Sequence, residues 1–247
     1  MDKLPEAMLV KTEAILLHHV RYSDNSLIAQ FYSREYGRLS VMVKGISSKK
    51  RSTKFSYFQP LNIFNVELYR YENREISNLK ELSLSFIPKN IPGDIHRSSI
   101  ALFISELLYS VIREEDVNRM LYNFIESSVI TLDEMTSGIS NFHLWFLVAF
   151  TAYTGIGPSP TTLSECYFDM VTGQFTQTAP SHTDYLEPRH ALILNQLLQM
   201  PAGELGELCL SGEERADLLE RILKYYRFHL PGIRQMRSLQ VLKEIFR

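Results

Sequence analysis

Two kinds of apolar pattern divide the chain. Its first part contains short segments rich in β-branched, aromatic and aliphatic side chains, which favour strands. These segments are residues 10–20, 26–34, 37–44, 61–71 and 76–84. Asp24-Asn25-Ser26 and Gly37 supply turns between the first three segments, and Asn73 supplies a turn between the last two. The pattern predicts five consecutive strands with one long connection after the third.

Five short strands with this spacing fit a small closed barrel. An OB-fold has this strand count, and it commonly binds single-stranded nucleic acid on one face. An SH3-like barrel has the same periodicity and stays an alternative at this point. In the long connection, Phe55 and Phe58 are predicted to belong to the barrel core, while Tyr57 is a candidate for stacking on a base.

The second part of the chain follows helical spacing. Apolar stripes cover residues 100–111, 121–132, 142–153 and 239–246. Two further helices are marked by their starts, Pro188 as a first-turn residue and Ser211 with Glu214 as a capping box. With a boundary at Pro88, we predict an α+β multidomain chain. A five-stranded barrel occupies residues 1–87, and an all-α helical domain occupies residues 88–247.

Positive charge concentrates in the connection after the third strand. Residues 1–90 hold 14 Lys and Arg against 9 Asp and Glu, a net charge of +5, whereas residues 91–247 have a net charge of −7. Five cations fall within residues 44–54: Lys44, Lys49, Lys50, Arg51 and Lys54. Cations bind phosphates, and neighbouring aromatic rings stack on exposed bases. The asymmetry therefore predicts a nucleic-acid-binding barrel, with an ordinary solvated loop as the alternative.

Motifs of the common catalytic classes are absent from the sequence. It contains no G-x-x-x-x-G-K-[ST], G-x-S-x-G or H-E-x-x-H. His18 and His19 are neighbours on a predicted strand, so their side chains point to opposite faces and do not readily share a metal. No apolar run approaches the ~20 residues that span a bilayer. Because Cys166 and Cys209 give no disulfide framework, we expect a protein of the reducing cytoplasm.

A set of short strings spread over nearly the whole chain carries a family resemblance. In the first part they are TEAILL (12–17), RYSD (21–24), GR (37–38), VKG (43–45) and FQPL (58–61). In the second part they are RSSIALF (97–103), GIGP (155–158), YYRFHL (225–230) and RSLQVL (237–242). In this order and spacing, the chain resembles the bacterial DNA repair protein family RecO.

The resemblance implies a recombination mediator, not an enzyme, with an N-terminal OB-fold and a helical C-terminal domain. It implies binding of single- and double-stranded DNA, annealing of complementary strands, and cooperation with RecR to load the recombinase RecA. It also implies recognition of the acidic C-terminal tail of the single-stranded DNA-binding protein, and a nucleoid-associated location in the cytoplasm. The alternatives are an OB-fold protein–protein adaptor and an RNA-binding barrel.

The candidate site residues are cations and one aromatic ring. The predicted DNA contacts are Arg21, Arg38, Lys44, Lys49, Lys50, Arg51, Lys54 and Tyr57. Arg21 and Arg38 come from the resemblance, and the others come from the charge and aromatic pattern. A partner's acidic tail needs a cation beside an apolar pocket, and Arg113, Arg119 and Arg227 lie next to apolar stripes.

One departure from the family concerns zinc. Many RecO proteins carry a four-cysteine zinc site after the GIGP string, whereas here only Cys166 remains of the first pair and no Cys-x-x-Cys follows. Structural zinc needs four nitrogen or sulfur ligands, so we predict no metal, no cofactor and a zinc-less insert around residues 156–187. We expect Phe168, Val171 and Phe175 to pack this insert around a turn at Thr172-Gly173.

Overall fold

A computed structural model describes residues 7–46, 55–71, 74–112, 117–230, 233 and 236–246. By their contacts, these residues form two compact units. One unit contains the N-terminal strands together with Ile104–Ile130, and the other contains Asp94–Phe103 together with the chain from Thr131 onward. Parts of two helices therefore belong with the strands, and the predicted boundary at Pro88 stays a prediction.

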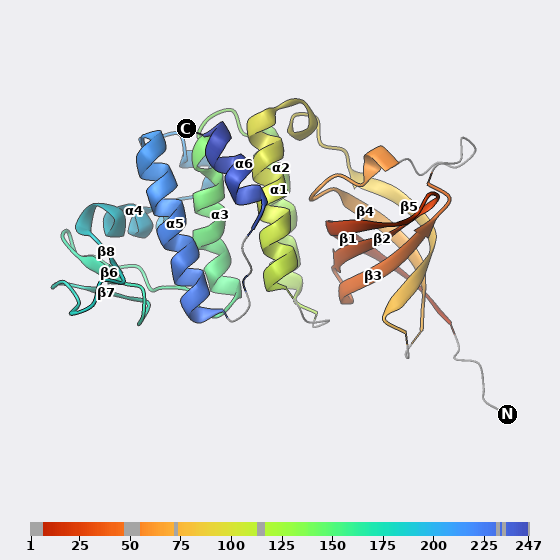
Figure 1. The fold of residues 1–247 in the computed structure, drawn as a ribbon, viewed down its shortest axis with the longest axis horizontal. Coiled ribbons are helices and arrows are strands. Elements are labelled where there is room, and N and C mark those ends of the chain that lie inside the picture. The colour runs from red at the N-terminus through yellow and green to blue at the C-terminus, as the bar shows by residue number, and fades with distance from the viewer. Residues whose placement is uncertain are drawn as a thin grey trace. The chain divides into compact units, whose positions relative to one another are not determined.

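The N-terminal strands form a closed five-stranded barrel (Figure 1). They are β1 (Met8–Ser23), β2 (Ser26–Ser33), β3 (Gly37–Lys44), β4 (Ile63–Arg70) and β5 (Ile76–Phe86). Their order around the barrel is β1-β2-β3-β5-β4, and β1 closes it by pairing with both β2 and β4. β3 and β5 run parallel, whereas the other pairs are antiparallel. The order and the parallel pair are those of an OB-fold, which confirms that prediction and decides against the SH3-like alternative.

The barrel interior is filled by alternate side chains of the strands. Along β3, Leu39, Val41 and Val43 are buried, while the residues between them are partly exposed. Phe64 of β4 meets Phe58 with their ring centroids 5.8 Å apart. Phe58 is only 1% exposed, so its predicted place in the core is confirmed. Burial of each such side chain stabilises the barrel by roughly 1.5–3 kcal/mol.

Helices make up most of the remaining chain (Figure 1). They are α1 (Ile95–Val111), α2 (Arg119–Glu134), α3 (Phe142–Phe150), α4 (Pro188–Gln199), α5 (Gly212–His229) and α6 (Ser238–Ile245). Both predicted helix starts are confirmed. Pro188 opens α4, and the Glu214 amide donates to Ser211 Oγ at 3.1 Å while the Ser211 amide donates to Glu214 Oε2 at 3.0 Å. Among the described residues, no helix is long and apolar enough to cross a membrane.

A three-stranded sheet lies between α3 and α4 in sequence. It contains β6 (Tyr167–Asp169), β7 (Gln174–Thr176) and β8 (Tyr185–Leu186) in the order β7-β6-β8. Phe168 packs against Phe175, with ring centroids 5.0 Å apart, as predicted. The prediction for Val171 is wrong: the Asp169 carboxylate accepts its amide in the turn, and its side chain is 47% exposed.

Candidate nucleic-acid interface

A small pocket forms at the end of the barrel where β1 turns into β2. Its volume is about 140 Å³, and it is lined by Arg21, Ser23, Asp24, Ser26, Leu27, Ile46 and Phe55. The Asn25 carbonyl accepts the amides of Gly45 and Ile46, at 2.6 and 3.2 Å, which joins the chain after β3 to the β1–β2 turn. Ser23 and Ser26 are joined by a hydrogen bond of 2.6 Å between their hydroxyls. The pocket therefore lies where the β1–β2 turn and the chain after β3 are held together by backbone hydrogen bonds.

Two predicted DNA contacts lie at this end of the barrel. Arg21 is exposed and lines the pocket, and Lys44 is exposed at the end of β3, opposite Ser26 in the strand register. The remaining loop cations, Lys49, Lys50, Arg51 and Lys54, lie outside the described residues. Ile46 and Phe55, the described residues on either side of that segment, both line the pocket.

The aromatic residues after the basic segment differ from their predicted roles. Phe55 is 52% exposed, so its predicted burial in the core is wrong. Its ring meets the ring of His19, with the ring centroids 5.5 Å apart and the planes nearly perpendicular. Tyr57 is half-buried and packs against the barrel core, so it offers less free ring surface than Phe55. Phe55 and Tyr57 both belong to one short 3-10 helix, Phe55–Tyr57, that directly precedes Phe58.

Arg38 is held by the end of a helix. Its guanidinium Nη1 donates to the carbonyls of Tyr109 and Ile112, at 3.2 and 2.6 Å, and the group lies 4.5 Å from the centre of the Tyr109 ring. Cations at a helix C-terminus satisfy carbonyls that lack intrahelical partners. The structure thus gives Arg38 a role in joining β3 to α1, and its predicted DNA contact stays a prediction.

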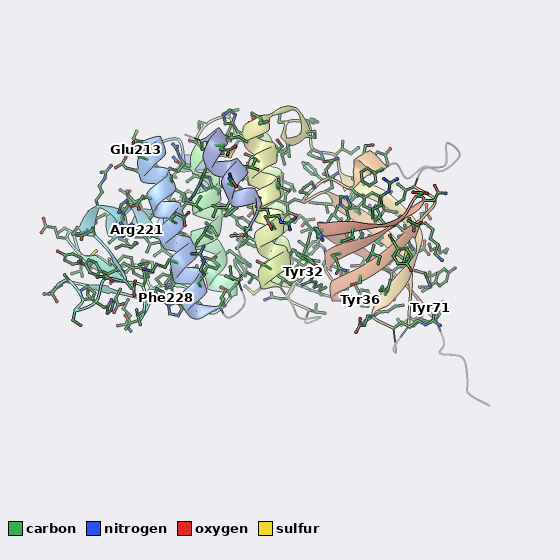
Figure 2. The ribbon with its side chains drawn as sticks, in the orientation of Figure 1. Tyr32, Tyr36, Tyr71, Glu213, Arg221 and Phe228 are labelled. Carbon is green, nitrogen blue, oxygen red and sulfur yellow. The ribbon has the colours of Figure 1, made fainter. Side chains whose placement is uncertain are left out.

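A second arginine joins the barrel to α2. Arg34 donates to both carboxylate oxygens of Glu126, at 3.0 and 2.9 Å, and pairs with Glu13 at 2.8 Å. It also lies 4.5 Å from the centre of the Tyr122 ring. Near it, the Tyr32 hydroxyl, labelled in Figure 2, donates to the Asn118 carbonyl at 3.2 Å. Because Arg34 is surrounded by carboxylates, it is poorly placed to bind a phosphate.

The two histidines on β1 add little positive charge at neutral pH. Burial lowers the pKa of His18, and the charge on Arg38 lowers it further, against the opposing effect of Glu106. Burial also lowers the pKa of His19, followed by the effect of His18. Both imidazoles are therefore mostly neutral near pH 7. The charge available at this end of the barrel comes from arginine and lysine.

The two predicted tail-binding cations that the structure describes, Arg119 and Arg227, belong to different compact units. Arg113 lies outside the described residues, and Arg119 is exposed at the first position of α2. Arg227 is exposed in the last turn of α5, beside Phe228, which is labelled in Figure 2 and is 45% exposed.

A hollow that the sequence did not indicate does place cations beside apolar side chains. Its volume is about 340 Å³, and it is lined by His143, Gly212, Glu213, Arg215, Ala216, Leu219, Leu242, Lys243 and Phe246. Arg215 donates to Asn141 Oδ1 at 3.2 Å and to the Leu210 carbonyl at 3.0 Å, and Lys243 pairs with Glu220. The capping box at Ser211 predicted α5 and the apolar stripe over residues 239–246 predicted α6, but the meeting of their side chains depends on the tertiary fold.

Side chains that could ligate a metal do not cluster in the part of the chain that the structure describes. There, no group of three or more His, Cys, Asp or Glu side chains is arranged to hold a metal ion. Cys166 is buried immediately before β6, and burial raises the pKa of its thiol. Cys209 is exposed.

Comparison with known proteins assigns the chain to a family. The sequence model described as "Recombination protein O N terminal" matches residues 8–87, and the one described as "Recombination protein O C terminal" matches residues 92–239. The chain belongs to the RecO family. RecO proteins act in DNA repair and recombination as mediators, and this chain therefore has a role in those processes.

Relatives from several bacteria match over nearly their full length. The DNA repair protein RecO of Phocaeicola vulgatus is 38% identical over 243 residues, which are 97% of this chain and 100% of that protein. RecO of Bacteroides fragilis is 38% identical over 242 residues, with the same coverage. RecO of Porphyromonas gingivalis is 30% identical over 244 residues, again covering 97% of this chain and 100% of that protein. The RecO resemblance of the sequence is thereby confirmed.

Proposed function

We propose that this RecO chain binds single- and double-stranded DNA through the end of the barrel that carries Arg21 and Lys44. One observation carries the proposal. The exposed Arg21 and the exposed ring of Phe55 line one pocket, and the exposed Lys44 pairs in the strand register with Ser26, which also lines it. In the sequence, Lys49, Lys50, Arg51 and Lys54 fall between Ile46 and Phe55, two residues of that pocket. Proteins that bind single strands commonly combine cations, which contact the phosphates, with aromatic side chains, on which the bases stack.

Strand annealing follows from the kind of contact. Arginine and lysine bind phosphates without reading the sequence, so the same site serves any pair of complementary strands. Neutralising the phosphates of both strands also lowers the repulsion between them. From annealing we extend the proposal to the mediator step, in which the protein, with RecR, helps to load RecA onto DNA coated with single-stranded DNA-binding protein. Because these steps take place on chromosomal DNA, the proposed location of the protein is the cytoplasm, in association with the nucleoid.

The acidic tail of the single-stranded DNA-binding protein is the proposed partner of the chain after the barrel strands. A tail that carries carboxylates and apolar side chains needs a cation beside an apolar hollow. Arg119 and Arg227 remain candidates, and Arg113 is a candidate from the sequence alone. The hollow between α5 and α6 meets both needs at once, since Arg215 and Lys243 line it together with Leu219, Leu242 and Phe246.

The test is annealing of complementary oligonucleotides already coated with the cognate single-stranded DNA-binding protein, followed by fluorescence at low and high salt. We expect acceleration that weakens with salt and that disappears when the acidic tail of the coating protein is deleted. Arg21→Ala combined with Lys44→Ala should slow annealing, while Lys89→Ala, a change of an exposed lysine distant in sequence, serves as the control. If the folded protein accelerates annealing at neither salt concentration, the DNA-binding proposal fails and an adaptor role replaces it.

Competition between DNA and RNA of the same sequence separates the proposal from an RNA-binding barrel. Phosphate contacts alone bind both polymers, whereas recognition of the 2′-hydroxyl favours RNA. We expect DNA to compete at least as well as RNA. A strong preference for RNA would contradict the proposal.

A further inference from the structure

We propose that the pocket at the β1–β2 turn receives one unstacked nucleobase, with Phe55 against the face of the base and Arg21 on the adjoining phosphate. This inference rests on the proposed function, that the barrel binds DNA. It adds a base-binding site to a surface whose predicted contacts were chiefly to phosphates, and it identifies Phe55 as the stacking residue.

The size of the pocket suits a single base. Pockets for drug-sized ligands typically have volumes of roughly 300–1,000 Å³. The volume here, about 140 Å³, is well below that range and suits one small ring system with its sugar and phosphate outside. The walls are held by backbone hydrogen bonds from Gly45 and Ile46 to Asn25, so the pocket exists before a ligand arrives.

The apolar wall of the pocket offers a stacking surface. Leu27 and Ile46 line it, and Phe55 is 52% exposed although large aromatic side chains are usually buried. His19 meets Phe55 nearly perpendicularly, so this contact leaves at least one face of the Phe55 ring without a stacked partner. Every base has a face that can stack on such a ring, which makes this contact tolerant of sequence.

The polar wall of the pocket matches the edge of a base. The hydroxyls of Ser23 and Ser26 can donate and accept hydrogen bonds, and the Asp24 carboxylate can accept them. An unpaired base presents the donors and acceptors that it would otherwise use for Watson–Crick pairing. In a duplex these groups are occupied and the base is stacked between its neighbours, so a paired base does not enter the pocket.

This difference has a consequence for annealing. A single strand is bound by its phosphates and by one base, whereas the duplex product is bound by its phosphates alone. When the base pairs with the complementary strand, it leaves the pocket and that part of the binding free energy is lost. The pocket therefore favours binding of the substrate strand and release of the annealed product.

The experiment compares base-bearing and abasic single strands of equal length, using fluorescence anisotropy with the full chain. The abasic strand keeps its phosphates and lacks its bases. We expect Phe55→Ala to weaken binding of the base-bearing strand about fivefold or more, as loss of one stacking contact would. Binding of the abasic strand and of duplex should be unchanged. Phe55→Tyr should restore tight binding, because tyrosine keeps the ring.

Tyr69→Ala is the matched control. Tyr69 is a partly exposed aromatic residue on β4, 37% exposed, and it does not line the pocket. Equal binding of base-bearing and abasic strands by the wild-type protein, with no effect of Phe55→Ala, would overturn the base pocket and leave phosphate binding intact. Equal weakening of both strands by Phe55→Ala would overturn it as well, since the residue would then act on the fold. If the wild-type protein binds neither strand at low salt, the proposed function fails first.

Discussion

Arg21 and Arg38 were predicted to share one role, and the structure separates them. Arg21 is exposed at the pocket, whereas the guanidinium of Arg38 donates to the carbonyls of Tyr109 and Ile112. We therefore expect opposite consequences from the two alanine substitutions. Arg38→Ala should lower the stability of the barrel unit and leave the salt dependence of DNA binding unchanged. Arg21→Ala should leave the stability nearly unchanged and weaken the salt dependence of DNA binding.

The size of each effect follows from the contacts. Hydrogen bonds from a charged group contribute roughly 1.5–3 kcal/mol each, and Arg38 is partly exposed, so we take about 2 kcal/mol for the pair. The cation–π contact with Tyr109 adds about 0.5–1 kcal/mol. The expected loss for Arg38→Ala is thus about 2–3 kcal/mol. Arg21→Ala, at an exposed position, should change stability by less than about 0.5 kcal/mol.

Two assays separate the outcomes. Urea unfolding followed by circular dichroism, with hydrogen exchange of the α1 amides, measures the stability of the barrel unit. Anisotropy of a labelled single strand over a range of salt concentrations measures the number of phosphate contacts. Each contact that is lost lowers the slope of log affinity against log salt by about 0.7 for single strands.

Arg38→Lys tests the geometry of the contact. Lysine keeps the charge but lacks the planar guanidinium that lies over the Tyr109 ring, so part of the stability should still be lost. A decrease of about 0.7 in the salt slope for Arg38→Ala, with unchanged stability, would refute the reasoning. It would show that the side chain leaves the helix end to bind DNA.

Three other predictions concern the compact unit that contains the chain from Thr131 onward. A Cβ at Gly138 (φ 72°) would lie 2.4 Å from the Leu205 carbonyl carbon, whereas one at Gly155 (φ 75°) meets nothing within 4 Å. Gly138→Ala should therefore lower the free energy of unfolding, measured in urea, by about 3 kcal/mol or more, and Gly155→Ala should lower it by about 1 kcal/mol. Equal losses for the two variants would contradict this reasoning. Burial first, then the charge of Arg215, lowers the pKa of His143 to about 3, so the protein should lose stability as the pH falls from 6.5 towards 3. His143→Phe should flatten that dependence in unfolding measured across this range, and an unchanged pH dependence would rule the histidine out as its source. The Ser211 amide, followed by Arg189, lowers the pKa of Glu214 to about 2, so the stability difference between wild type and Glu214→Ala should shrink as the pH falls from 4.5 towards 2. A difference that persists at pH 2 would contradict this account of the capping box.

The strands and helices could be predicted because their signals are local. Each strand or helix repeats its apolar side chains with the period of its own backbone, and the capping box and Pro188 act within one turn. The predicted segment 61–71 began two residues before β4, and residues 10–20 covered only the centre of β1, because pairing across the barrel extends or shortens a strand. The strand count and the long connection indicated a small barrel, and the pairing of β1 with β4 and of β3 with β5 decided that it is an OB-fold.

Only the tertiary structure decided which side chains form the candidate site. Phe55 and Phe58 are the same residue type three positions apart, and one is 52% exposed while the other is 1% exposed. Likewise, Arg21 and Arg38 are equally cationic in the sequence, but only Arg38 meets the end of α1. In irregular connections and at strand ends, no repeating pattern sets the direction of a side chain. Its surroundings are set by segments distant in sequence, and those contacts exist only once the chain has folded.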